Sequence, residues 1–419
     1  MIQIGKKRIS IYMILGMYML IYNPPIFTFG SFRFNCVWPV MFISAAYVLL
    51  HRKNLKEMMN LREIRRTEIV LGGLLVYLMA VAVLHQNSVT YFAYLVYWMA
   101  ADIPFALACT IHLRRRGLGF TELLDHLLIT GTIMALTAAA AILIPAVNEF
   151  FTARMAAYGV PYAIKQAAYR NFGFAANLTS TASYAQAVLA CIALYRGARG
   201  KRLWLIPFPI LAFSANINTR TSTPLILAGM AAGMIAVLLS RDRRRISVYA
   251  VVSVTAAAVA FFGLGLVRAI NPLTYEWLTS GIGQISSFVA GEQTEGGYFS
   301  EMLQMFGILP GGADLFFGVG TGILDGTKYA VNSDVGFIND IWRGGILYLL
   351  VMTGLLLRTL LRFIRGGTLR REDGIYLAVL FLFVFVITNI KGSFFIHSDV
   401  TVIFWLLVPT LVWEKTEGA

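Results

Sequence analysis

The sequence has 419 residues, of which 58% are hydrophobic and 13% are charged, and its formal net charge is +14. Soluble proteins carry about 25% charged residues, so this composition, with a mean hydropathy of +0.70, excludes an ordinary globular domain and indicates a polytopic membrane protein. In such a protein the basic residues report topology first, so the positive charge does not by itself indicate nucleic-acid binding.

A helix that crosses the hydrocarbon core of a bilayer needs about 20 apolar residues. Apolar runs of roughly this length, bounded by charged or turn residues, recur along the chain and predict an all-α fold. They predict twelve membrane spans, at residues 9–27, 33–50, 67–85, 90–112, 121–145, 173–195, 203–218, 222–240, 246–267, 339–361, 374–390 and 399–413. The first run lacks a small-residue cleavage site, so we expect a retained helix rather than a removed signal.

Charges between these runs predict the topology. With the N-terminus inside, 26 of the 35 Lys and Arg residues fall in inner segments, so the positive-inside rule places both termini in the cytoplasm. Residues 1–267 then carry nine spans and a shorter outer loop at 146–172, and residues 339–419 carry three spans and a cytoplasmic tail. Residues 268–338 between them form one long outer loop, rich in Gly, acidic and aromatic residues, which we interpret as half of an active site.

Two arginines lie on the predicted outer face, where the topology rule expects few. Arg170 opens "YRNFGFAAN" before the sixth span, and Arg220 lies in "NINTRTSTP" between the seventh and eighth. Thr223 and Pro224 resemble an N-cap and a first helical residue, so Arg220 is expected beside a helix N-terminus, which favours anions. Because a guanidinium binds phosphate oxygens in bidentate fashion, this pair suits the pyrophosphate of a lipid carrier. The competing interpretation is that each side chain extends to lipid headgroups or pairs with an acid.

Asp334 lies close to the interface, just before the tenth span. A carboxylate there can act as general base on a sugar hydroxyl, although an acid at a helix N-terminus also serves a structural role. Asp340 and Arg343 are three residues apart and are expected to pair on one helix face.

Further polar positions carry weaker signals. Arg268, Arg343 and His397 are secondary site candidates near the outer face, and Asp102 falls near the middle of the fourth span, where an acid marks either an ion site or a helix-to-helix hydrogen bond. The run "GVGTG", Gly318 to Gly322, has no preceding strand, so we interpret it as a close-packed turn that lets backbone approach the substrate. Loop aromatics such as Trp277 either stack on sugars or pack the loop down.

Four motifs together resemble the O-antigen polymerase and O-antigen ligase superfamily of bacterial envelope enzymes. They are "YRNFGFAAN", "NTRTSTPLIL", "LFFGVGTG" and "NSDVGFINDIWRGGILYLL", and they span roughly residues 165–360. The ligases carry a histidine where this chain has Asp334, which favours polymerase over ligase.

The resemblance implies a C-type glycosyltransferase fold that acts on undecaprenyl-pyrophosphate-linked glycan at the outer leaflet of the bacterial inner membrane. In that reading Arg170 and Arg220 match the carrier-binding arginines, Asp334 is the catalytic base, and no metal or other cofactor is needed. The lipid-linked glycan is both donor and acceptor, a chain-length regulator protein is a further expected partner, and nucleic acid is not expected.

Two alternatives stay open. A twelve-span transporter or flippase of lipid-linked sugars would place its functional charges at the midplane, where Asp102 lies, rather than at the outer face. A ligase would share the site and transfer finished polymer to another acceptor.

Overall fold

The computed structural model describes the chain from residue 2 to residue 417, with gaps. The residues left out are 1, 5–6, 27, 30–31, 60–61, 89–91, 159–169, 171–172, 176–179, 220, 240–242, 291–302, 322–332, 366–368, 396–398 and 418–419. The described residues are mainly helical, and the strands among them form two short antiparallel hairpins, β1 (Ile2–Ile4) with β2 (Lys7–Ile9) and β3 (Thr28–Phe29) with β4 (Phe32–Arg33).

Each predicted span overlaps a helix. In chain order these helices are α1 (Ile11–Tyr22), α2 (Val37–Leu50), α4 (Arg62–Leu84), α5 (Ala93–Tyr97) running through the π-helical η2 (Trp98–Asp102) into α6 (Ile103–Arg114), α7 (Phe120–Leu143), α10 (Ser180–Ala198), α11 (Phe208–Asn218), α12 (Ser222–Leu239), α13 (Arg243–Ile270), α17 (Gly336–Arg365), α18 (Arg371–Ile390) and α19 (Asp399–Glu417). Further elements lie between them: α3 (Arg52–Met59), α8 (Pro145–Ala157), η3 (Arg202–Leu205), α14 (Pro272–Val289) and α16 (Asp314–Phe317).

Six helices in the described part of the chain are long and apolar enough to cross a membrane, as expected of an α-helical membrane protein. They are α4, the continuous segment from α5 to α6, α7, α12, α17 and α18. Some of the other predicted spans are shorter as helices. For example, α1 ends after 12 residues because Asn23 takes a left-handed conformation and two prolines follow. The predicted count of twelve crossings therefore stays a prediction.

The segment predicted as one long outer loop contains regular structure. Helix α13 continues to Ile270, and α14 begins directly afterwards at Pro272, a residue that favours the first turn of a helix. The beginning of residues 268–338 is thus helical, and the short helix α16 follows later. The sequence did not indicate these helices, because amphipathic stretches such as "PLTYEWLTSGIGQISSFV" lack the uniform apolarity used to find spans. The location of residues 268–338 outside the membrane stays a prediction.

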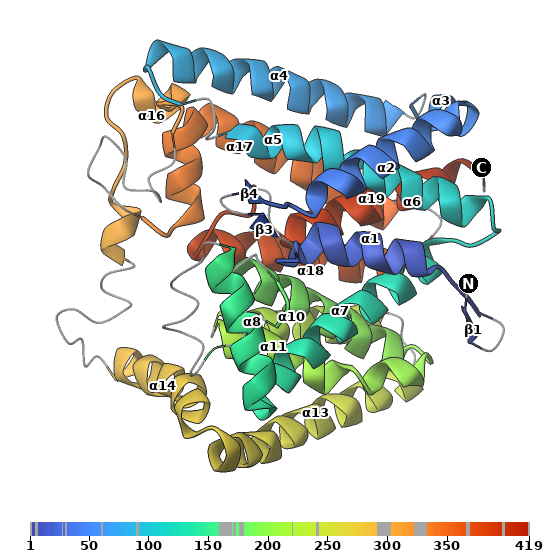
Figure 1. Ribbon diagram of the computed structural model, residues 1–419, viewed down its shortest axis with the longest axis vertical. Coiled ribbons are helices and arrows are strands. Elements are labelled where there is room, and N and C mark those ends of the chain that lie inside the picture. The colour runs from blue at the N-terminus through green and yellow to red at the C-terminus, as the bar shows by residue number, and fades with distance from the viewer. Residues whose placement is uncertain are drawn as a thin grey trace.

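Helix α10 is the central helix of the fold. Residues 182–198 are all buried, and α10 packs against α7, α11, α12, α18 and α19. Small residues permit this close packing, as where Gly229 of α12 meets Cys191 of α10. Helix α4, in contrast, lies at the edge of the molecule, with many apolar side chains exposed (Figure 1).

The two ends of the helical bundle differ. Both chain termini lie at one end together with α3, whereas α14 and α16 lie toward the other (Figure 1). Ion pairs hold the terminal end, among them Arg196 with Asp125 at 2.9 Å, Arg199 with Asp373 at 3.1 Å, and Arg362 with Glu63 at 2.6 Å. The predicted placement of that end in the cytoplasm is not tested by the fold.

Candidate functional site

Arg170 is fixed by an aromatic ring of the segment that was predicted as the outer loop. The Arg170 guanidinium carbon lies 4.0 Å from the ring centroid of Trp277 on α14, a cation–π distance. The Trp277 indole N–H in turn donates to the carbonyl of Ile217 near the end of α11, at 2.9 Å. Trp277 therefore packs its segment down, one of its two predicted roles, and holds Arg170 next to the turn that follows α11.

Arg220 lies outside the described residues, but both of its neighbours are described. The Thr219 and Thr221 hydroxyl oxygens are 2.8 Å apart, and the Thr221 hydroxyl is also 2.8 Å from that of Tyr184 on α10. Helix α12 begins right after, at Ser222, one residue before the predicted N-cap; Thr223 instead donates to the Asn216 side chain at 2.6 Å. The turn that carries Arg220 is thus joined to α10 at the α12 N-terminus.

Asp334 is exposed immediately before α17, and its backbone is held by the turn after α18. The Gly392 N–H donates to the Asp334 carbonyl at 2.6 Å, and Val335 forms a parallel bridge with Gly392. A buried Asn339 side chain donates to the carbonyls of Ser333 and Val335, at 2.6 and 3.0 Å. The backbone on both sides of the exposed carboxylate therefore has fixed partners.

Tyr184 connects the two regions. Its hydroxyl, which contacts Thr221, also donates to the carbonyl of Lys391 at 3.3 Å, and Lys391 precedes the Gly392 that pairs with Asp334. A continuous series of contacts therefore runs from Arg170 through Trp277 and the α11–α12 turn to Tyr184 and on to the backbone of Asp334. The structure joins these segments, while the chemical roles of their side chains remain predictions.

The secondary candidates lie in different surroundings. Arg343 is buried and pairs with Asp340 at 2.7 Å, which confirms the predicted helix-face pair. The exposed Arg268, on α13, has its guanidinium 5.5 Å from the ring centroid of Tyr275 on α14. His397 lies outside the described residues. Asp102 is buried in the π-helical segment η2.

The glycine run packs closely against two helices. Gly318 has a positive φ of 74°, and a Cβ there would lie 2.6 Å from the Cα of Gly344; Gly320, with a φ of 75°, meets the backbone of Ala82 equally closely. Val319 and Gly320 donate N–H groups to the carbonyls of Trp342 and Arg343, at 2.8 and 3.0 Å. At these two positions the run approaches the backbone of α17 and α4, which confirms a close-packed turn, while its approach to a substrate stays a prediction.

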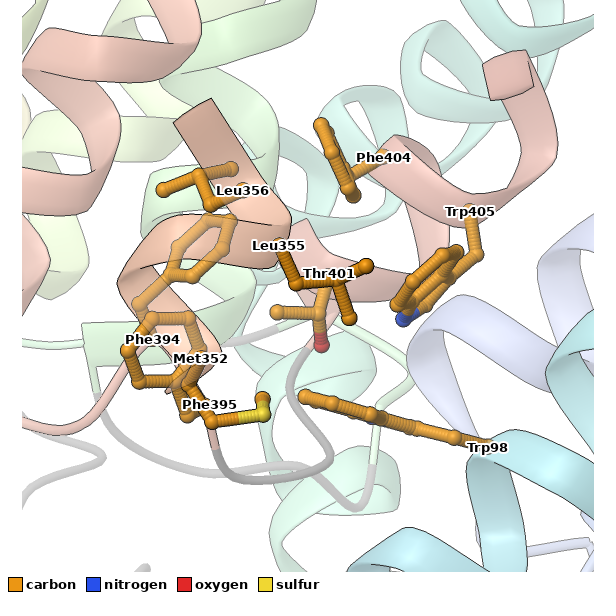
Figure 2. A pocket seen from close by; sticks show the side chains of 9 residues that line it. All are labelled: Trp98, Met352, Leu355, Leu356, Phe394, Phe395, Thr401, Phe404 and Trp405. Atoms are coloured by element: carbon orange, nitrogen blue, oxygen red, sulfur yellow. The ribbon is translucent and has the colours of Figure 1, made fainter. Parts of the chain in front are cut away.

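A small apolar cavity lies beneath the turn that holds Asp334. Phe394 and Phe395 of this turn line it together with Met352 of α17, Trp98 of η2 and Trp405 of α19 (Figure 2). Its volume of about 10 Å³ holds at most one water molecule. The cavity is therefore part of the packing that anchors the turn rather than a substrate pocket.

The residues that organise this region carried weak signals in the sequence. Tyr184 and Ser393 lie in segments without a motif, and their partners Thr221, Lys391 and Asp340 are 37, 207 and 53 residues away in the chain. No group of three or more His, Cys, Asp or Glu side chains in the described part of the chain could hold a metal ion. Comparison with protein-family models and with curated protein sequences found no match.

Proposed function

We propose that this protein is a lipid-linked polysaccharide polymerase of the O-antigen type, located in the bacterial inner membrane. The proposal rests on the sequence motifs together with one structural observation: the segments that carry Arg170, Arg220 and Asp334 are joined by contacts through Trp277, Tyr184 and Gly392. An anion-binding group and a base from distant parts of the chain would need such a connection to act on one substrate.

The proposed reaction is an inverting glycosyl transfer. Asp334 takes the proton from a hydroxyl of the incoming lipid-linked repeat unit, and the hydroxyl oxygen attacks the anomeric carbon of the growing chain. The bond from that carbon to the carrier pyrophosphate breaks, and the pyrophosphate leaves with the bonding electron pair. Arg170 and Arg220 stabilise its developing charge. The exposed position of Asp334 supports this role, because the carboxylate has to reach an acceptor that arrives from outside the helices.

Substitution of the two central residues tests the proposal. We expect Arg220→Ala and Asp334→Asn, each in a strain that lacks the native gene, to leave single repeat units on the surface instead of a polymer ladder on gels of surface glycan. Loss of a positioned general base costs about 10²- to 10⁴-fold in rate. Lys53→Ala, on the exposed face of α3, is the matched control for loss of a surface charge and should preserve the ladder. A full ladder from both variants, at normal protein levels, would remove the assignment.

The same experiment separates the alternatives. Polymer that accumulates on the carrier would indicate a ligase. A surface that lacks even single repeat units would indicate a transporter, the alternative favoured by the buried Asp102 in a π-helical segment, since such segments frequently mark functional sites.

A further inference from the structure

A buried ion pair lies directly behind the segment that carries Asp334. Asp340 is fully buried and Arg343 is 4% exposed, both on the first turns of α17, and the Arg343 Nη1 is 2.7 Å from the Asp340 Oδ1. Replacing such a pair with apolar side chains is often neutral or stabilising, so its stability contribution alone does not explain why it is present.

The Asp340 carboxylate has a second partner outside its own helix. Ser393, 6% exposed, donates its hydroxyl to the same Oδ1 at 3.0 Å, across 53 residues of sequence. The other oxygen, Oδ2, has no hydrogen-bond partner among the described residues. Asp340 therefore contacts the turn after α18 through one oxygen, whose position Arg343 fixes.

Ser393 is adjacent to the residue that holds Asp334. Gly392 donates its N–H to the Asp334 carbonyl and bridges to Val335, and the Phe394 N–H donates to the Asn389 side chain at 3.1 Å. The fit is close, because a Cβ on Gly336 would overlap the Gly392 carbonyl. A shift of this turn would therefore shift the backbone of Asp334.

From these contacts we infer that Asp340, held by Arg343, is a positioning residue that orients Asp334 through Ser393 and Gly392. The inference rests on the proposed function for the role of Asp334. The hydrogen bonds from Ser393 to Asp340 and from Gly392 to Asp334, together called the anchor, can be tested separately. A displacement of a catalytic group by about 1 Å can cost roughly 10²-fold in rate, so a single hydroxyl at this position matters for turnover.

The test removes the Ser393 hydroxyl and leaves both charges in place. In purified full-length protein, Ser393→Ala should speed amide hydrogen exchange in peptides that cover 389–395 and 333–340 by on the order of tenfold, as expected for a hydrogen bond to a charged group. Polymer in cells should fall by a similar factor, and Ser393→Thr, which keeps the hydroxyl, should restore both. The matched control is Ser44→Ala, which removes the buried hydroxyl of a serine on α2. It should change neither the exchange rate of these peptides nor the amount of polymer.

The outcomes of these measurements separate the positioning role from the proposed function. Unchanged exchange in Ser393→Ala, or faster exchange with a full polymer ladder, would overturn the positioning role. If Arg220→Ala and Asp334→Asn both keep a full ladder while Ser393→Ala still exchanges faster, the proposed function fails and the anchor survives. Should Ser393→Ala not accumulate in membranes, Asp340→Glu gives the same readout, because it keeps the charge for Arg343 but moves the oxygen away from Ser393.

Discussion

At the scale of single residues, the Arg170 side chain and the Asp334 backbone both contact uncharged neighbours. Arg170 lies over Trp277, and the Asp334 backbone is bonded to Gly392. An arginine that loses its ring partner retains its charge but loses one contact that orients it. A bidentate contact with phosphate depends on orientation more than a point charge does.

Two substitutions of Trp277 separate its functions. Trp277→Phe keeps an aromatic face for Arg170 and loses the hydrogen bond to Ile217, so we expect a loss of about 1 kcal/mol in stability and a retained polymer ladder. Trp277→Ala also loses the cation–π contact and should reduce polymer strongly. The apparent melting temperature in detergent and the surface glycan ladder are the measurements. Trp38→Ala, on the exposed face of α2, is the control; equal ladders from Trp277→Ala and Trp38→Ala would refute the role.

At the scale of elements, α17 is the helix on which the 316–320 segment docks. Its backbone leaves helical geometry at Gly344, with φ of −143°, and at Gly345, with φ of 68°. This break frees carbonyls of the preceding turn, which accept N–H groups from Val319 and Gly320. The Tyr77 hydroxyl of α4 adds contacts of 2.8 and 3.1 Å to the carbonyls of Phe317 and Gly344. The break in α17 thus provides the hydrogen-bond acceptors to which the 316–320 segment binds.

Alanine substitution at two glycines of α17 should give opposite results. At Gly345 a Cβ would overlap the Phe316 carbonyl and the positive φ adds strain, so we expect Gly345→Ala to lose about 3 kcal/mol of stability. Gly354 is exposed with open space at its Cβ position, so Gly354→Ala should be neutral or stabilising by about 0.5–1 kcal/mol. Melting temperatures in detergent compare the two. Equal effects would mean that the 316–320 segment does not dock as described.

At the scale of the whole molecule, the two ends have different chemistry. The end with the termini carries Arg and acid pairs between helices, and the opposite end carries α14, α16 and the segments of the candidate site (Figure 1). The predicted inner segments carry 26 of the 35 Lys and Arg residues, so the positive-inside rule predicts a cytoplasmic location for the end with the termini.

Single reporter cysteines test this orientation. All three native cysteines are buried, so their labelling should be low. In intact cells with a permeable outer envelope, a membrane-impermeant maleimide should label Ala313→Cys, beside α16, whereas Lys53→Cys on α3 should react only after the inner membrane is opened. The reverse pattern would invert the topology and place the candidate site in the cytoplasm, where the proposed polymerisation does not occur.

The sequence by itself determined the membrane class, the positions of the helical runs and the Asp340–Arg343 pair, because these follow from local composition and from spacing along one helix. It also selected Arg170 and Arg220 as basic residues on a predicted outer face where few are expected, and Asp334 as a carboxylate close to the interface. Only the tertiary structure decided what holds them: Tyr184, Trp277 and Ser393 act across contacts between distant segments. The contacts of the glycine run with α17 and α4 were not foreseen for the same reason, since a positive φ predicts close approach but not what is approached.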